Sequence, residues 1–113
     1  MPTPEPQGAA RVIANFESLA ALTDQMLAAA QAGKWDDLVS VERKRSELVV
    51  AMRQSDAAAV LDDAANRRKR DVIAQVKARD EEIRQLTQAW MDDFRLTMQS
   101  SQQELRLARK YGL

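Results

Sequence analysis

The chain has 113 residues, a length that favours a single domain or bundle over two independent cores. Its 17 Lys and Arg residues balance 17 Asp and Glu residues, and it contains no histidine and no cysteine. These absences exclude a zinc site built from Cys or His, disulfides, and Ser-His-Asp or Cys-His catalysis. The three glycines stand singly, which excludes a glycine-rich phosphate loop. We therefore expect a protein that is not an enzyme, needs no cofactor and does not bind nucleic acid directly.

The composition predicts an all-α protein. Apolar residues make up 45% of the chain, and all three prolines precede residue 7. Residues 1–8 alternate proline with polar residues and are expected to form a flexible tail. No apolar run approaches the ~20 residues needed to span a bilayer, and we expect no secretory signal at residues 1–8. We expect a cytoplasmic protein without a transmembrane segment.

The first helix is predicted from about Ala9 to about Ala32, where Gly33 provides a left-handed C-cap. Apolar residues at coiled-coil spacing define its inner face, and a second line seven residues apart widens that face enough to contact two neighbours. The first line is Val12, Phe16, Leu19, Thr23, Met26 and Ala30, and the second is Ile13, Ala20 and Leu27.

The second helix is predicted to begin near Trp35, with Asp36 and Asp37 at the positive end of its dipole. Its inner face is Leu38, Val41, Arg45, Leu48 and Met52. Because only Gly33 and Lys34 separate the two helices, they must form an antiparallel hairpin. Trp35 is expected to close the end of the core.

The third helix is predicted to be long, covering at least Asn66 to about Gln99. Asp56 is a candidate cap for a start at Ala57, whereas a loop through Ala65 gives a later start. Its inner face follows the same spacing through Ile73, Val76, Asp80, Ile83, Thr87, Trp90, Phe94 and Thr97. Residues 9–99 would then form a three-helix antiparallel bundle.

A short fourth helix is predicted within residues 100–113, after Ser100-Ser101-Gln102-Gln103 interrupts the apolar pattern. It carries Leu105, Leu107, Ala108 and Tyr111 and ends at Gly112. The first helix spans ~36 Å, but the third reaches ~60 Å, so its distal surface needs another cover. Three covers compete for it: the fourth helix folding back, a second copy of the chain as a homodimer, or another protein.

Two charged residues lie on the predicted inner faces, Arg45 and Asp80. Such residues need a partner or water and are expected to set the register of the helices. A tight turn near Asp56 would place Arg45 level with Arg68–Asp71, whereas a longer loop through Ala65 would bring it nearer to Asp80. The basic run Arg67–Arg70 is either a solvated helix face or a docking site for an acidic protein surface.

The order and spacing of several motifs resemble the FliT family of flagellar type III export chaperones. The likeness covers about residues 9–112. It rests on Phe16–Leu22, on Met26–Leu38 with its Gly33-Lys34-Trp35-Asp36 turn, on Glu42, Arg45 and Leu48, on Ile73, Asp80 and Ile83, and on the ending Lys110-Tyr111-Gly112. The chain departs from some members at Ala57-Ala58-Ala59, where a proline-glycine turn can occur.

This resemblance implies a cytoplasmic chaperone that binds the C-terminal amphipathic segment of the filament-cap protein and prevents its premature assembly. It further implies delivery to the export gate and export ATPase, with the last helix masking the client surface in the free protein. Enterobacterial members also inhibit the flagellar master transcriptional activator. The tyrosine used at the export gate in this family corresponds to Tyr111.

The resemblance and the length argument together predict the client-binding residues Ile83, Leu86, Trp90 and Phe94, with Leu105, Leu107 and Ala108 in the regulatory helix. Truncation after Gln99 is then expected to raise client affinity. Two alternatives remain open. One is a chaperone for another late flagellar substrate, such as a hook–filament junction protein. The other is a coiled-coil adaptor that regulates flagellar transcription without a role in export.

Overall fold

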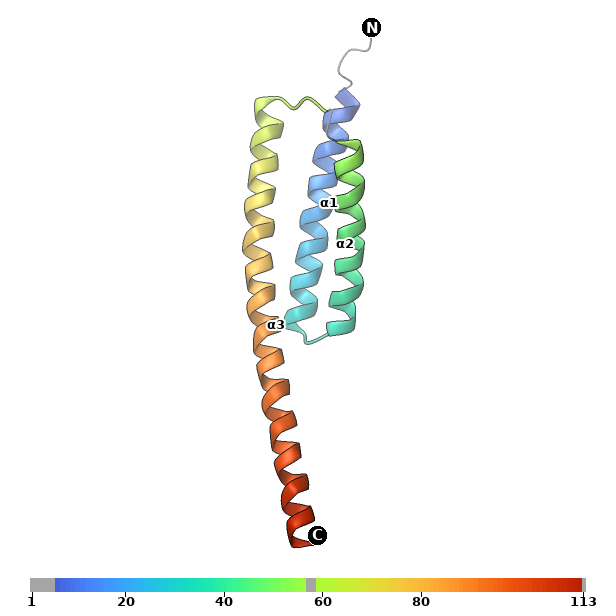
Figure 1. Ribbon diagram of the computed structural model, residues 1–113. Coiled ribbons are helices and arrows are strands. Elements are labelled where there is room, and N and C mark those ends of the chain that lie inside the picture. The colour runs from blue at the N-terminus through green and yellow to red at the C-terminus, as the bar shows by residue number, and fades with distance from the viewer. Residues whose placement is uncertain (1–5, 57–58, 113) are drawn as a thin grey trace. The chain divides into compact units, whose positions relative to one another are not determined.

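The computed structural model describes residues 6–56 and 59–112, with side chains from Gly8 onward, and every element in these ranges is helical. The elements are α1 (Pro6–Gln31), α2 (Trp35–Ser55) and α3 (Asp63–Tyr111) (Figure 1). The chain forms two compact units, Met1–Ile83 and Arg84–Leu113, and α3 contributes to both. The predicted all-α class and the long third helix are therefore confirmed.

The turn between α1 and α2 is a Schellman motif built on Gly33, whose φ is 70°. The Lys34 N–H donates to the Ala29 carbonyl at 2.9 Å, and the Gly33 N–H donates to the Ala30 carbonyl at 3.2 Å. These bonds satisfy carbonyls that the end of α1 would leave unpaired. The chain therefore reverses in a few residues, and α1 and α2 lie side by side as the predicted antiparallel hairpin (Figure 1).

The start of α3 is fixed by Asp62, which caps the helix instead of the predicted Asp56. The Asp62 Oδ1 atom accepts a hydrogen bond from the Ala65 N–H at 2.7 Å, as an N-cap side chain does. Asp56 is the C-cap of α2 and accepts from the Asn15 side chain on α1 at 3.0 Å. The start at Asp63 lies between the two predicted positions, and Ala57 and Ala58 lie outside the described residues.

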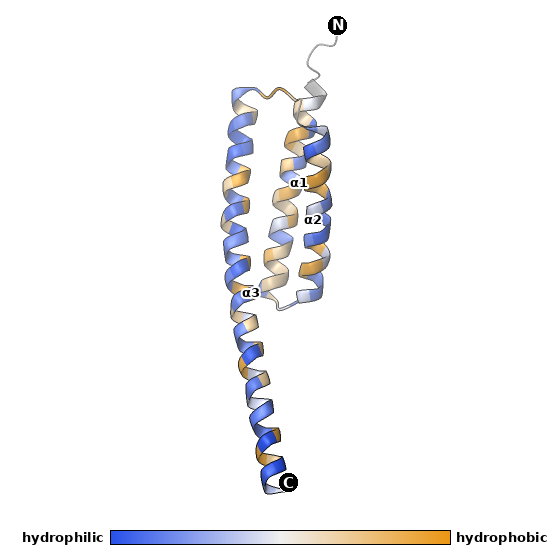
Figure 2. Ribbon diagram, viewed as in Figure 1, coloured by the Kyte–Doolittle hydropathy of each residue, from blue (hydrophilic) through white to orange (hydrophobic). Residues whose placement is uncertain are grey.

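The core of the Met1–Ile83 unit follows the predicted inner face of α1. Both predicted lines contribute buried residues, namely Val12, Ala20, Thr23, Met26, Leu27 and Ala30, while Phe16 and Leu19 are half-buried. On α2 only Met52 is buried, and on α3 only Val72 and Ile83 are. Val72 is 0% exposed although it stands one position outside the predicted face. Figure 2 shows hydrophobic residues along α1 and α2 and a more hydrophilic α3.

The predicted fourth helix is wrong, because residues 100–111 continue α3 without a break. Ser100, Ser101, Gln102 and Gln103 change the apolar pattern, but none of them prevents helical geometry as proline would. Gly112, with a φ of 67°, follows the last helical residue, Tyr111. Leu105 and Leu107 therefore lie on the same helix as Trp90 and Phe94 instead of folding back over them.

Candidate protein-binding surfaces

A polar cluster joins all three helices inside the Met1–Ile83 unit. Arg45 on α2 donates to the Asp80 carboxylate on α3 at 2.6 Å and to the Thr23 hydroxyl on α1 at 3.2 Å. The Thr23 hydroxyl, which is 0% exposed, donates in turn to the Leu19 carbonyl at 2.8 Å. Arg45 and Asp80, the two charged residues on the predicted inner faces, therefore pair with each other. This is the outcome expected of a longer loop before α3. We interpret the cluster as fixing the register of the three helices. It does not contain a second acid or base for proton transfer.

Ion pairs at the surface also connect α1 to α3. Arg68 binds Glu17 through two nitrogens, with an Nη2–Oε2 distance of 2.7 Å. This hydrogen bond lowers the pKa of the Glu17 carboxyl and raises the pKa of Arg68. Arg79 and Asp24 form a second link at 3.3 Å. Arg68, which belongs to the predicted basic run Arg67–Arg70, therefore forms an ion pair within the protein.

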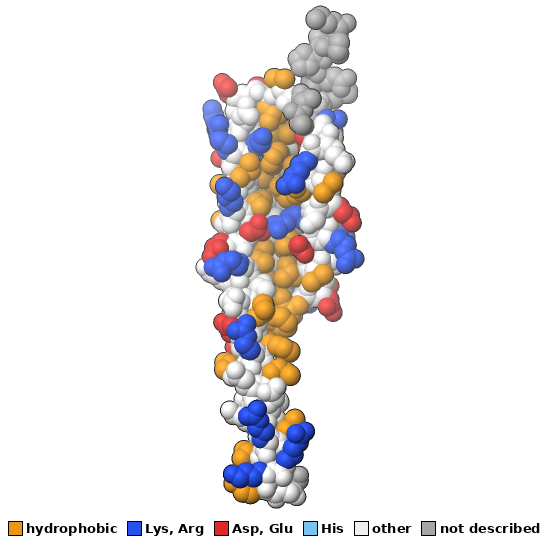
Figure 3. All heavy atoms as spheres, in the orientation of Figure 1, with side chains coloured by type: hydrophobic (Ala, Val, Ile, Leu, Met, Phe, Trp, Pro, Cys, Tyr) orange, Lys and Arg blue, Asp and Glu red, His pale blue; other side chains and the backbone are white. Residues whose placement is uncertain are grey.

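An apolar hollow of about 690 Å³ opens between α2 and α3, with α1 as its floor. An adjoining hollow of about 440 Å³ shares Leu19, Val49 and Arg53 with it and reaches the Arg45–Asp80 pair. We call the two together the bundle groove. Its apolar lining is Val12, Phe16, Leu19, Val49, Val50, Met52, Ala59, Leu61, Ile73 and Val76. Figure 3 shows a band of hydrophobic side chains along this part of the molecule, edged by charged ones.

A second apolar surface lies on the Arg84–Leu113 unit, and we call it the distal stripe. It consists of Leu86, Trp90, Phe94 and Met98, which are spaced by four residues, and of Met91, three residues before Phe94 on the same side of α3. The Trp90 and Phe94 rings stack with centroids 5.8 Å apart. Trp90 is 43% exposed and Phe94 56%, so both rings present apolar area to solvent. Leu86 is half-buried.

The four predicted client-binding residues divide between the two units. Ile83 is buried in the Met1–Ile83 unit, at 8% exposure, and has little surface to offer a partner. Leu86, Trp90 and Phe94 belong to the distal stripe. In the sequence, these four residues form one continuous apolar face of α3. Burial within the bundle and contact with a partner both require apolar residues at the same helical spacing, so the spacing does not distinguish them.

The predicted regulatory residues point in different directions on α3. Leu105 follows Phe94 by three full turns and therefore extends the face of the distal stripe, as Ala108 does. Leu107 lies on the opposite side with Leu96, and both are more than half exposed. Tyr111 is 65% exposed, with the Lys110 ammonium 5.7 Å from its ring centroid.

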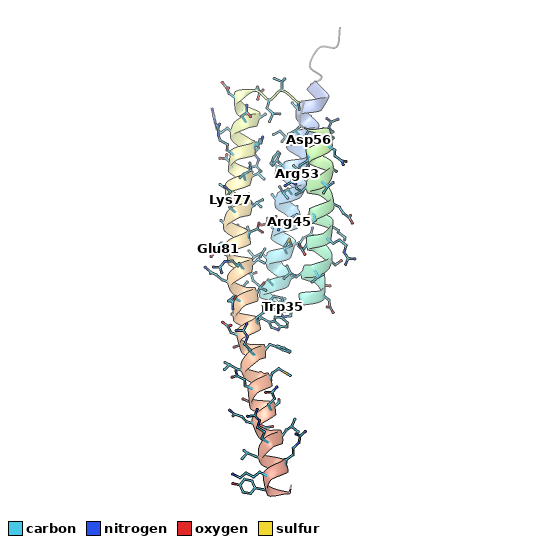
Figure 4. The ribbon with its side chains drawn as sticks, in the orientation of Figure 1. Trp35, Arg45, Arg53, Asp56, Lys77 and Glu81 are labelled. Carbon is cyan, nitrogen blue, oxygen red and sulfur yellow. The ribbon has the colours of Figure 1, made fainter. Side chains whose placement is uncertain are left out.

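The sequence reasoning missed the bundle groove. Val49 follows the predicted Leu48 and Arg53 follows Met52, so both lie beside the expected inner face of α2, whereas Val50 lies farther around the helix and is 53% exposed. Figure 4 labels Arg45, Arg53 and Asp56 along α2 and its end. The sequence feature that could have indicated the bundle groove is a widened apolar face on α2, similar to the second line of apolar residues on α1.

Other kinds of site find no support in the described part of the chain. Within residues 6–56 and 59–112, no group of three or more acidic side chains is arranged to hold a metal ion. Across the same residues, none of the helices is both long enough and apolar enough to cross a membrane. The bundle groove and the distal stripe are two apolar surfaces of this part of the chain.

A family comparison and a comparison with a curated protein point to the same family. Residues 13–113 match the model of a family described as flagellar protein FliT. The chain is 28% identical over 99 residues to a flagellar protein FliT from Cronobacter sakazakii (strain ATCC BAA-894). That alignment covers 87% of this chain and 81% of the relative. No solved structure matches the chain.

Proposed function

Because the chain belongs to the FliT family of flagellar proteins, with a chaperone-type role, we propose that it is the export chaperone of the filament-cap protein. It binds the C-terminal amphipathic segment of this client in the cytoplasm, prevents premature assembly and delivers the client to the type III export apparatus. The observation that carries this proposal is the distal stripe, an exposed apolar surface of the kind that marks interaction sites.

The distal stripe suits an amphipathic helical client. Its residues recur at the spacing of one helix face, and its two aromatic rings offer large apolar area at low conformational cost. A client helix that lays its own apolar face along Leu86, Trp90 and Phe94 would bury all three side chains. The apolar segment of the client is then shielded from premature self-association.

Delivery requires a second contact that stays accessible while the client is bound. Tyr111 is exposed, stands at the last helical position and lies off the face of the distal stripe. We propose that it docks at the export gate. Tyr111→Ala should therefore weaken capture of the isolated gate domain and leave client affinity unchanged, and equal capture by both proteins would remove Tyr111 from this role.

Masking of the client surface by residues 100–113 is not part of the proposal. Masking would require α3 to break near Ser100, and α3 is continuous there. Truncation after Gln99 measures this directly. We expect the truncated and full-length proteins to bind a client peptide with similar affinity, and a large gain in affinity on truncation would reveal a folded-back state.

The proposed function is tested by the identity of the client. The full-length chain is mixed separately with the purified filament-cap protein and with a hook–filament junction protein, and each complex is measured by calorimetry. We expect a stoichiometric complex with the cap protein, lost when the C-terminal segment of the cap protein is removed. Binding of the junction protein alone would favour another late client, and binding of neither would favour a non-export adaptor.

A further inference from the structure

The five methionines hold all the sulfur of this chain, because the sequence contains no cysteine. A methionine thioether is oxidised to the sulfoxide most readily where an oxidant reaches the sulfur, so exposure decides which methionines react. Met26 and Met52 are buried in the core, at 4% and 9% exposure, whereas Met91 and Met98 are 44% and 46% exposed. Met1 lies outside the described residues. Among the described residues, the methionines open to an oxidant are therefore those on the distal part of α3.

Both exposed methionines belong to the distal stripe. They stand seven residues apart, or about two turns, so their side chains leave α3 on the same side. Phe94 is three residues after Met91 and four before Met98, the spacings at which side chains on a helix are neighbours. The Phe94 ring also stacks on the Trp90 ring, with the centroids 5.8 Å apart. A chemical change at either sulfur therefore alters the polarity of the surface beside this aromatic pair.

The helix itself does not require methionine at these two positions. Leucine has a similar helix propensity and a similar apolar volume, so α3 and the apolar character of the stripe would both survive the exchange. Methionine adds a flexible, polarisable side chain, which suits a surface that adapts to a partner, and a sulfur atom that can be oxidised. The sulfur chemistry of Met91 and Met98 can therefore be removed by substitution without removing the distal stripe.

The exposure of both side chains determines the effect of a sulfoxide. In the free protein, water can solvate the polar S=O group at either position, so oxidation should change the stability of the fold little. A partner that covers the distal stripe with an apolar surface removes this water and offers no hydrogen bond in return. Oxidation at Met91 or Met98 therefore destabilises the complex and not the folded chain. Oxidation of Met26 or Met52 would instead place a polar group in the core.

We infer that Met91 and Met98 form a modification site, at which oxidation to methionine sulfoxide makes the distal stripe polar and weakens its complex with an apolar partner. The inference rests on the proposed function in taking the client as that partner. It adds to the proposed function a control by redox conditions, in which the bundle stays folded while the distal stripe loses affinity for the client.

The oxidant belongs to the peroxide class, of which hydrogen peroxide is the simplest member. A lone pair of the Met91 or Met98 sulfur attacks one peroxide oxygen, the O–O bond breaks, and an S–O bond forms. The other oxygen leaves as water after it takes up the proton of the first, so the sulfur is oxidised and the peroxide is reduced. A methionine sulfoxide reductase reverses the change with a dithiol, which becomes a disulfide as the sulfoxide oxygen leaves as water.

The test uses the full-length protein and a matched double variant, Met91→Leu with Met98→Leu. This variant keeps the other methionines, so it reports any effect of oxidation outside the distal stripe. Both proteins are treated with a limiting amount of hydrogen peroxide, and the oxidised positions are mapped by mass spectrometry of proteolytic peptides. Calorimetry with the C-terminal peptide of the filament-cap protein gives the client affinity before and after treatment, and urea unfolding gives the stability of each sample.

We expect Met91 and Met98 to be oxidised before Met26 and Met52. The affinity of the treated wild-type protein for the client peptide should fall roughly tenfold at an unchanged urea midpoint, and a methionine sulfoxide reductase should restore it. The leucine variant should bind the peptide as well as the untreated wild-type protein does, both before and after peroxide treatment.

Three results would overturn the inference. The first is oxidation of Met26 or Met52 as early as that of Met91 and Met98. The second is an unchanged client affinity in the oxidised wild-type protein. The third is an equal loss of affinity in the treated leucine variant, because the cause would then lie outside the distal stripe. If the untreated protein does not bind the peptide, the proposed function is wrong and the inference with it, whereas undiminished binding after oxidation defeats the inference alone.

Discussion

The Arg45–Asp80 pair should stabilise the bundle asymmetrically, so that removing the acid costs more than removing the base. The perturbations are Arg45→Met, which keeps most of the apolar stem, Asp80→Ala, and the double variant. The pair joins α2 to α3 at 2.6 Å, at one end of the bundle groove. Its strength therefore bears on how firmly the two walls of the groove are held.

The magnitudes follow from the exposure of the two side chains, 20% for Arg45 and 42% for Asp80. In Arg45→Met, water can solvate the remaining carboxylate, so we expect a loss of about 0.5–1 kcal/mol in the free energy of unfolding. In Asp80→Ala, the less exposed guanidinium keeps only the Thr23 hydroxyl at 3.2 Å, and we expect about 1–2 kcal/mol. The coupling energy of the double-mutant cycle should be about 0.5–1 kcal/mol.

Urea unfolding followed by circular dichroism supplies all four free energies of the cycle. The predicted order of stability is wild type, then Arg45→Met, then Asp80→Ala. The double variant should lie close to Asp80→Ala or above it, because the unpaired cation has gone. A coupling energy of zero, or a larger loss in Arg45→Met than in Asp80→Ala, would refute the reasoning from exposure.

Three further predictions concern the fold. Gly33→Ala should cost about 1 kcal/mol of stability, because no atom obstructs a Cβ there but φ is 70°; an unchanged urea midpoint would contradict this. Val72→Ala should cost about 2 kcal/mol from its fully buried site, whereas Val39→Ala, at a 55% exposed site, should change stability by less than about 0.5 kcal/mol. Arg68 lowers the pKa of Glu17 below its ordinary value of 4.5. The stabilisation from this ion pair should therefore be fully present above pH 4.5 and vanish as the pH falls through the lowered pKa. Wild type and Glu17→Gln should therefore differ in urea midpoint at neutral pH and converge in acid, and a constant difference would argue against it.

The sequence predicted the local structure of the hairpin well because the signals there are strong and short-range. Gly33 adopts the left-handed conformation that its position predicts, and Asp36 and Asp37 mark the start of α2. The pairing of Arg45 with Asp80 was one of two outcomes that depended on loop length. That length is set by the Asp62 cap, a choice between two Asp residues that propensity alone does not decide.

The end of α3 differs from the structure that the apolar pattern predicted. A gap in the apolar spacing at Ser100–Gln103 indicates a change in what the helix contacts, but it does not break the helix. Similarly, Val72 and Ile73 are adjacent apolar residues, and the packing of α3 in the bundle decides which of them is buried. These are tertiary effects, which the spacing within one helix does not encode.

The central claim is that the distal stripe binds the client, and one pair of variants tests it directly. Phe94→Ala removes a ring of the stripe, whereas Leu96→Ala removes an equally exposed apolar side chain about 200° around the same helix. Calorimetry with the C-terminal peptide of the filament-cap protein should show about a tenfold or greater loss of affinity for Phe94→Ala and almost none for Leu96→Ala. Equal affinities for the two variants, or a larger loss for Leu96→Ala, would contradict the claim.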